Sequence, residues 1–143
     1  NKLLTKKIIK MGRVFYNTRQ RIINVNAAYT AVPEDSGSVF MIDASTGFNI
    51  ALPAASDAEE GWNAKFIIKT AASTNVTISA TDGDGDNMLM QAHSLDGTDR
   101  QVTAADVFTF ASAEKGDLMH MVCDGTSWYL NAWVADDGHA ALA

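Results

Sequence analysis

The chain has 143 residues, of which 47% are hydrophobic and 20% charged, with one cysteine and a formal net charge of −6. A chain of this length usually forms one domain and buries about 68–70% of its unfolded surface, so this composition excludes a disordered polar segment, a collagen-like fibre and a disulfide-stapled mini-protein. No apolar run approaches the ~18 residues that a membrane helix needs, and the first residues carry too short an apolar stretch for a signal peptide.

The predicted elements begin, in chain order, with one short helix and continue as strands. Residues 3–11 place Leu4, Ile8 and Met11 on one helical face, and Gly12 ends this pattern. From Arg13 onward, short apolar or alternating runs rich in Val, Ile, Thr and aromatic residues predict β-strands. These runs lie at residues 14–16, 21–25, 39–42, 48–52, 65–69, 75–79, 88–91, 101–103, 107–111, 118–123 and 127–134.

Turn-forming residues separate these runs at 33–37, 45–47, 82–85, 96–97 and 124–125. Strands of about five residues at about ten-residue spacing, with no intervening helices, predict an all-β fold, a single β-sandwich or barrel of jelly-roll-like type. One helical turn is expected at residues 56–60, with Ser56 or Asp57 as its N-cap. We therefore divide the chain into an extended basic arm, residues 1–27, and a β body, residues 28–143.

Positive charge is concentrated in the arm. Residues 1–33 hold seven cations and no acid, whereas residues 34–143 hold four cations and all seventeen acids, a net charge of −13. Such asymmetry is typical of an arm that docks on an acidic partner, which is nucleic acid, another protein or a neighbouring copy. We expect no nucleic acid, because the acidic body repels phosphate and the arm has few aromatic residues. The remaining alternative is a solvated basic strand with no partner.

We expect the arm to dock on protein, with its apolar side chains setting the affinity and its cations setting orientation and association rate. The predicted docking residues are Lys2, Leu3, Leu4, Lys6, Lys7, Ile8, Ile9, Lys10, Arg13, Phe15, Arg19 and Arg21.

The segment with the most metal-like pattern is Asp82, Asp84 and Asp86, which alternate with glycines. Alternating carboxylates on a glycine-permissive loop suit a hard cation such as Ca²⁺. The EF-hand spacing fails, however, because Asn87 stands at position six and His93 at position twelve. We favour the alternative, a hairpin loop in which Asp and Gly tolerate positive φ, and we expect no metal and no cofactor.

No arrangement of nucleophile, base and acid predicts catalysis. Strand alternation places His120 on one face of residues 118–123 and Cys123 on the other, so we expect Cys123 in the core and His120 at the surface. The lone cysteine forms no internal disulfide, and we expect a reducing, intracellular site of assembly. The tail that holds Asp136, Asp137 and His139 is expected to be a frayed or docking terminus. We therefore predict that the chain is not an enzyme.

Four aromatic residues raise the possibility of a sugar-stacking platform: Trp62, Trp128, Tyr129 and Trp133. Such a platform needs two or three aromatic side chains on one face. Trp128 and Tyr129 are adjacent on a strand and face opposite ways, so one is core and the other exposed. Trp62 follows Glu59, Glu60 and Gly61 and is expected to be exposed in a turn.

The order of several segments resembles a group of tailed-bacteriophage virion proteins. The quoted segments are YTAVPEDSG at 29–37, VFMID at 39–43, FNIALP at 48–53, KFIIK at 65–69, NVTIS at 75–79, GDNM at 85–88 and LMHMVCDGTSWYL at 118–130. Together they span about residues 29–135. Ser38 departs from the pattern, which has Lys there, and the arm and an insertion-like loop at residues 90–100 depart as well.

Proteins of this group are capsid decoration (cement) proteins, head fibres and parts of tail appendages, usually trimeric β-sandwiches or barrels without catalytic residues. The resemblance implies a homotrimer that binds the major capsid protein on the outer surface of a phage head and is assembled in the host cytoplasm. It implies no nucleic acid, membrane or small-molecule partner. The alternative is a tail-fibre or receptor-binding, carbohydrate-binding module, and a polysaccharide or nucleotide hydrolase is a third hypothesis with no supporting motif.

Overall fold

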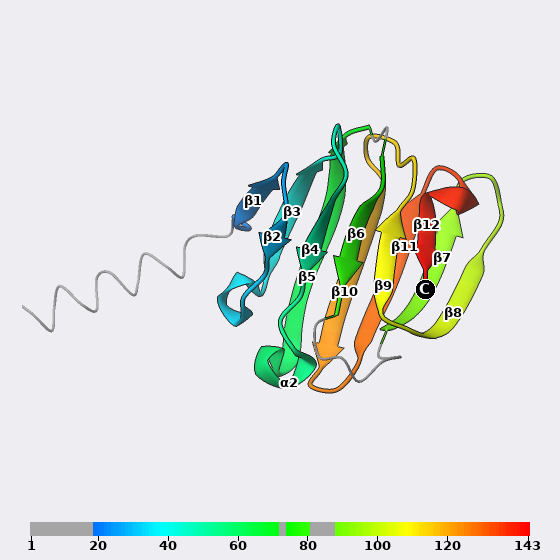
Figure 1. The fold of residues 1–143 in the computed structure, drawn as a ribbon. Coiled ribbons are helices and arrows are strands. Elements are labelled where there is room, and N and C mark those ends of the chain that lie inside the picture. The colour runs from blue at the N-terminus through cyan, green and yellow to red at the C-terminus, as the bar shows by residue number, and fades with distance from the viewer. Residues whose placement is uncertain (1–18, 72–73, 81–87) are drawn as a thin grey trace, which may run out of the picture.

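The computed structural model describes residues 19–71, 74–80 and 88–143, and it has two β-sheets that face each other across a shared core (Figure 1). The all-β fold predicted from the sequence is therefore confirmed, and of the two predicted alternatives, sandwich or barrel, the structure is a sandwich. Among these residues, no helix has the length and apolar character needed to cross a membrane. The predicted helix at 3–11 and the predicted strand at 14–16 lie outside the described residues.

The larger sheet has seven strands, in the order β1 (Ile22–Val25), β3 (Ser38–Asp43), β5 (Glu60–Thr70), β10 (Leu118–Asp124), β11 (Trp128–Val134), β7 (Met88–Ser94) and β8 (Arg100–Ala105). The smaller sheet has five, in the order β12 (Ala140–Leu142), β9 (Val107–Phe110), β6 (Val76–Ser79), β4 (Phe48–Ala51) and β2 (Tyr29–Thr30). The described helices are short: η1 (Pro33–Asp35), α2 (Ala55–Ala58) and η2 (Asp137–His139).

The N-terminal half of the body winds back and forth between the two sheets. Strands β1, β3 and β5 pair in parallel in the larger sheet, and β2, β4 and β6 pair in parallel in the smaller one. Each successive strand of a sheet therefore pairs with the strand that preceded it in that sheet. Similar side chains become register partners in this way, as Phe40 of β3 does with Phe66 of β5. Their rings stack at 4.8 Å with 11° between the planes. The C-terminal half adds antiparallel pairs to both sheets.

The core lies between the sheets and is filled by alternate residues of each strand, as strand geometry requires. On β10 the buried residues are Met119, Met121 and Cys123, so the predicted burial of Cys123 is confirmed. Trp62 was expected to be exposed, and this prediction is wrong: only 2% of it is exposed, and its ring meets that of Trp128 edge-on at 5.4 Å. Strand β5 begins at Glu60, before the tryptophan, and carries Trp62 into the core.

Three local predictions need correction. Residues 22–25, assigned to the arm, form β1 and pair with β3. Helix α2 begins at Ala55, after Ala54 as N-cap without a side-chain cap bond, so neither Ser56 nor Asp57 caps it. Residues 90–100 do not form a loop throughout, because they include most of β7 and the tight turn that joins it to β8.

Candidate functional site

The outer face of the larger sheet carries two exposed aromatic side chains on one strand. On β11, Trp128 and Leu130 point into the core, whereas Tyr129, Asn131 and Trp133 point outward. Tyr129 is 46% exposed and Trp133 is 48% exposed. Four residues at the rise of a β-strand separate the two by about 13 Å. One strand therefore presents two flat apolar surfaces to the same side.

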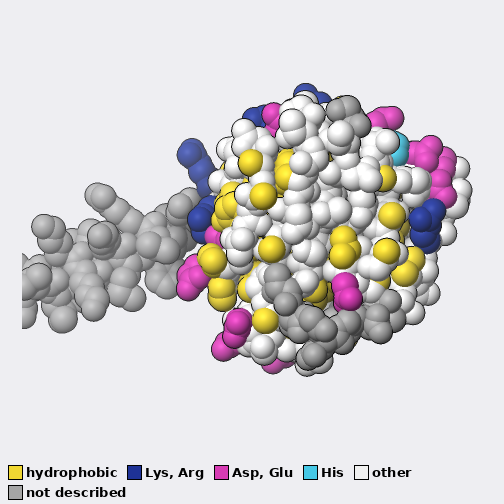
Figure 2. Space-filling model, viewed as in Figure 1, with side chains coloured by type: hydrophobic (Ala, Val, Ile, Leu, Met, Phe, Trp, Pro, Cys, Tyr) yellow, Lys and Arg dark blue, Asp and Glu magenta, His cyan; other side chains and the backbone are white. Residues whose placement is uncertain are grey.

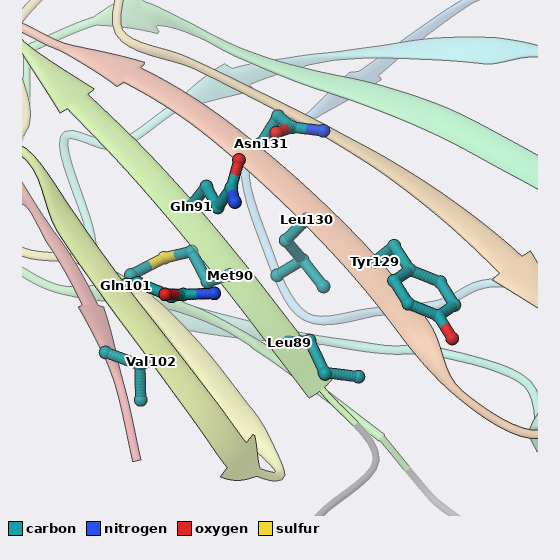
Figure 3. Close-up of a pocket in the computed structure, with 8 residues that line it drawn as sticks. All are labelled: Leu89, Met90, Gln91, Gln101, Val102, Tyr129, Leu130 and Asn131. Atoms are coloured by element: carbon teal, nitrogen blue, oxygen red, sulfur yellow. The ribbon is translucent and has the colours of Figure 1, made fainter.

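A row of carboxamides crosses the sheet between these two aromatic residues. Asn131 of β11 is in register with Gln91 of β7, and Gln91 is in register with Gln101 of β8. With Tyr129 and Leu89, these side chains line a shallow groove, and Figure 3 shows the amides on the neighbouring strands. In the described part of the chain, no hydrogen bond engages the three carboxamides. Their donors and acceptors are available to a ligand.

The position of the Tyr129 ring is fixed through its hydroxyl group. Its hydroxyl donates to Oδ2 of Asp124 at 3.1 Å. Oδ1 of Asp124 accepts from the backbone N–H groups of Thr126 and Ser127 at 2.9 and 2.7 Å. These backbone donors lower the pKa of Asp124, and the hydrogen bond to that carboxylate raises the pKa of Tyr129. The turn after β10 thus fixes the direction of the exposed ring.

Trp133 lies beside a second hollow at the other end of β11. Its ring stacks on that of His93, with centroids 6.1 Å apart and planes at 25°. Nδ1 of His93 lies 3.3 Å from Oδ1 of Asp99. The hollow is also lined by Leu95, which is 89% exposed. The Trp133 ring therefore packs on the His93 ring and also borders this hollow.

The strip formed by the outward side chains of β11, β7 and β8 carries no formal charge apart from any proton on His93. These outward residues are Leu89, Gln91, His93, Gln101, Thr103, Tyr129, Asn131 and Trp133. We call this set the amide–aromatic strip. In a chain whose acids outnumber its cations by seventeen to eleven, an uncharged strip favours a neutral ligand over a charged one.

The other sheet provides a contrast. On its outer face, Nδ2 of Asn49 donates to the Ser79 hydroxyl at 3.0 Å, and the Thr77 hydroxyl donates to Oδ1 of Asn49 at 2.7 Å. This amide is satisfied within the protein. Figure 2 shows that face, with charged side chains mainly around its rim. The amide–aromatic strip lies on the opposite side of the sandwich.

A buried carboxylate ties the C-terminal tail to the sheets. Asp117, 4% exposed, accepts from the backbone N–H groups of Ala135 and Glu114, both at 3.0 Å. Nδ1 of His139 lies 3.1 Å from Oδ2 of the same carboxylate. Residues 140–142 then pair with β9 as β12. The tail was expected to be a frayed or docking terminus, and the first of these alternatives is wrong, because its small residues pair at the edge of the smaller sheet.

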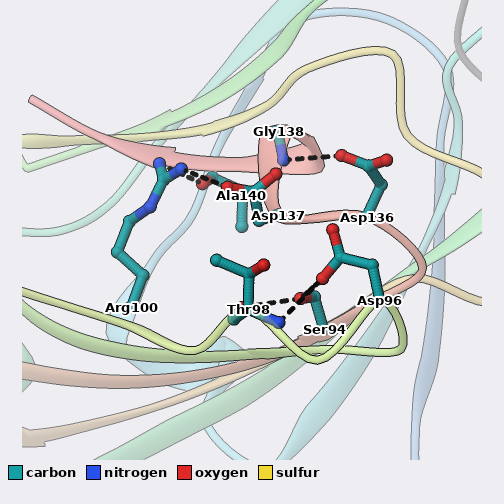
Figure 4. Close-up of polar contacts among 8 residues, drawn as sticks. All are labelled: Ser94, Asp96, Thr98, Arg100, Asp136, Asp137, Gly138 and Ala140. Carbon is teal, nitrogen blue, oxygen red and sulfur yellow. Dashed lines mark hydrogen bonds and ion pairs between the residues drawn. The ribbon is translucent and has the colours of Figure 1, made fainter.

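Three carboxylates gather at the turn after β7, where sequence reasoning placed no metal. Oxygens of Asp96, Asp136 and Asp137 lie within 4.8 Å of one another, in number enough to hold a cation (Figure 4). Each already has a partner in the protein. Asp137 pairs with Arg100 at 3.0 Å, Asp136 accepts from the Gly138 N–H at 3.0 Å, and Asp96 accepts from the Ser94 hydroxyl and the Thr98 N–H. The predicted candidates Asp82, Asp84 and Asp86 lie outside the described residues.

The described structure contains two of the predicted docking residues, Arg19 and Arg21. Nη1 of Arg21 lies 3.2 Å from Oδ1 of Asp35, whose side chain is 2% exposed. Asp35 also accepts from the Tyr29 hydroxyl at 2.9 Å and the Val32 N–H at 3.0 Å. The start of β1 is therefore fastened to the body. The other docking residues, Lys2, Leu3, Leu4, Lys6, Lys7, Ile8, Ile9, Lys10, Arg13 and Phe15, lie outside the described residues.

Comparison with known proteins gives no match. No protein-family model, no curated protein and no solved structure is significantly similar to this chain.

Sequence reasoning did not predict that Tyr129 and Trp133 lie on the same outward face, although strand alternation over residues 128–134 places both side chains there. It compared Tyr129 only with its neighbour Trp128, and the prediction that one of these two is core and one exposed is confirmed. The carboxamide row has no signal in the sequence. It exists because β7 lies parallel to β11, and no local pattern predicts that neighbour.

Proposed function

We propose that this chain is a virion structural protein that decorates the outer surface of a phage head and is not an enzyme. It docks on the major capsid protein through its basic arm, and three copies form the working unit. The support comes from the resemblance of residues 29–135 to virion proteins and from the concentration of seven cations ahead of an acidic body.

The single structural observation that supports docking through the arm is the way the arm joins the body. Arg21 is bound to the buried Asp35, and β1 forms the edge of the larger sheet. The first described residues are therefore held in place beside β1, which is an edge strand among the described residues, and such an edge can receive a strand from another subunit. Exposed ion pairs contribute only about 0.2–1 kcal/mol each, so apolar arm residues and threefold avidity supply most of the affinity.

The test is binding of purified protein to heads of the parent virus that lack it. Deletion of residues 1–18 keeps the Arg21–Asp35 pair and the β1 strand, so the body is expected to fold and to lose head binding. Replacing Leu3, Leu4, Ile8 and Ile9 with serine should raise the dissociation rate. Replacing Lys2, Lys6, Lys7 and Lys10 with glutamine should mainly slow association. Undiminished binding by the deletion variant would overturn the proposal.

A receptor-binding module of a phage appendage is the second candidate, favoured by the two aromatic side chains on one exposed face. The number of copies per purified particle, measured by quantitative mass spectrometry, separates the two. A number close to that of the major shell protein supports decoration, and a few copies per particle support an appendage.

A further inference from the structure

We infer that the amide–aromatic strip is a binding site for a neutral, extended oligosaccharide. This site is independent of the arm and of where the protein sits in a particle. The inference combines three observations: two half-exposed aromatic rings on one strand, a row of three carboxamides that have no hydrogen-bond partner among the described residues, and the lack of formal charge on the eight side chains of the strip.

The aromatic rings select the class of ligand. A pyranose ring has an apolar face of C–H groups, which packs on an aromatic ring, and hydroxyls at its edge, which need hydrogen bonds. Tyr129 and Trp133 supply two such rings about 13 Å apart along β11. This separation exceeds a monosaccharide and suits a chain of several sugar units. The ligand therefore runs along β11, with one sugar on each aromatic ring.

The carboxamides provide the polar half of the contact. Each amide offers two N–H donors and a carbonyl acceptor, which is the pairing that a sugar hydroxyl needs. Asn131, Gln91 and Gln101 lie in one register row, and Asn131 lies midway between Tyr129 and Trp133. A sugar between the two aromatic rings therefore meets amides along its edge. Convergent polar groups beside apolar surface are typical of ligand sites.

The charge pattern argues against the other ligands that stack on aromatic rings. Nucleic acid also stacks on tyrosine and tryptophan, but its phosphates require Lys or Arg, and the strip contains neither. The charged groups at the two ends of the strip are Asp124 beside Tyr129, Asp99 beside His93, and Glu114, Lys115 and Asp117 around the hollow beside Trp133, so four carboxylates face one cation. These carboxylates repel an acidic polysaccharide as well. A neutral glycan is the chemistry that remains.

The experiment uses the full chain and affinity electrophoresis in gels that contain hydroxyethyl cellulose, glycol chitin, mixed-linkage β-glucan, dextran or, as the acidic comparison, alginate. We expect retardation by at least one neutral polymer and none by alginate. Titration with the matching hexasaccharide should change tryptophan fluorescence, and because Trp62 and Trp128 are buried, the change reports Trp133. Trp133→Phe should keep binding and lose most of this change.

Tyr129→Ala and Trp133→Ala are each expected to weaken binding about tenfold, and the double variant should abolish it. Tyr129→Phe, which keeps the ring and removes only the bond to Asp124, should stay within about twofold. Val32→Ala is the matched control, because Val32 is 43% exposed and lies away from the strip. Unchanged thermal melting and near-ultraviolet circular dichroism establish that the variants fold.

Two results would overturn the inference. The first is that no neutral polymer retards the protein, or that retardation is the same for Tyr129→Ala and Trp133→Ala. The second is that these variants convert an oligomer into a monomer by light scattering, because the strip would then be a contact between copies. Loss of head binding on deletion of residues 1–18 bears only on the proposed docking, so the two proposals fail separately.

Discussion

Nδ1 of His139 lies 3.1 Å from Oδ2 of Asp117, and this contact joins the last turn of the chain to the connection that precedes β10. The same carboxylate accepts two backbone N–H groups, from Ala135 and Glu114. Two segments, the connection before β10 and the chain that follows β11, therefore meet at one buried carboxylate. The tail forms a strand, rather than fraying, because its polar groups find partners there.

Replacing Asp117 with alanine is expected to lower the free energy of unfolding by about 1–3 kcal/mol, since it leaves buried backbone donors unpaired. His139→Ala, which removes only one of the three contacts, should cost less. Urea unfolding measures both changes. Asp99→Ala is the control, because that carboxylate is 69% exposed and should matter little. Equal stability of Asp117→Ala and the parent protein would contradict this account of the tail.

The anchoring of β1 predicts a change in proteolysis. Asp35 holds the guanidinium of Arg21, the Tyr29 hydroxyl and the Val32 N–H. Without that carboxylate, β1 opens more often, and trypsin cleaves after Arg21 only in the open state. We expect Asp35→Ala to speed this cleavage about tenfold, which corresponds to ~1.4 kcal/mol.

The control for that experiment is Glu34→Ala, which removes the neighbouring, exposed carboxylate and should leave the cleavage rate unchanged. The fragment that begins at Ile22 is identified by mass spectrometry. If Asp35→Ala and Glu34→Ala are cleaved equally fast, the buried carboxylate does not hold β1.

The positions of the strands could be predicted from sequence more readily than the order in which the strands pair within each sheet. Alternation over residues 118–123 placed the core face of β10, and alternation over residues 127–134 put Trp128 and Tyr129 on opposite faces of β11 without deciding which is core, because a strand's period of two is local. The parallel stacking of β1, β3 and β5 depends on which sheet each successive strand joins. That choice is made by packing across the core, as when Phe40 stacks on Phe66, and no window of sequence contains it.

The incorrect prediction for Trp62 shows the limit of turn signals. The turn itself exists, since Glu59 has φ of 66° and Gly61 has φ of 95°. Trp62 itself is not part of that turn, however: it is in β5, with its Nε1–H donating to the Val32 carbonyl at 3.4 Å. Burial against Trp128 decides where the strand begins, and this partner lies 66 positions away in the sequence.

The pKa of His120 is expected to lie below the ordinary value of 6.5. Partial burial is the main cause, and the positive charge of Lys65, its register partner on β5, adds to it. In Lys65→Met the pKa of His120 should rise but stay below 6.5, because the burial remains. Titration followed by NMR measures both values. A pKa above 6.5 in the parent protein would contradict the described packing.

The sign of the pH effect follows from the same shift. Since the folded protein holds His120 with a lowered pKa, the unfolded chain binds more protons between the folded value and 6.5. Stability therefore falls as the pH decreases through that range and changes no further, on this account, below the folded pKa. The comparison that isolates the effect is His120→Gln, whose stability should depend less on pH in this window.

Two glycines should respond differently to substitution. A Cβ at Gly47 would lie 2.9 Å from the backbone oxygen of Asn75, where β4 and β6 begin side by side, whereas a Cβ at Gly37 would meet nothing within 4 Å. Gly37 has φ of +81°, so its substitution strains only the backbone. Asparagine tolerates positive φ better than alanine does. Gly37→Asn should therefore be milder than Gly37→Ala, which costs about 1–2 kcal/mol.

At Gly47 we expect a different order of stability for the Asn and Ala variants, because the Cβ of either side chain would collide with a backbone oxygen. Gly47→Asn is expected to be at least as destabilising as Gly47→Ala, and both should lower the midpoint of thermal unfolding. The same four variants, measured together, separate close approach from backbone conformation as the reason for each glycine. If Gly47→Asn restored stability relative to Gly47→Ala, the parallel strands β4 and β6 could not begin as closely as described.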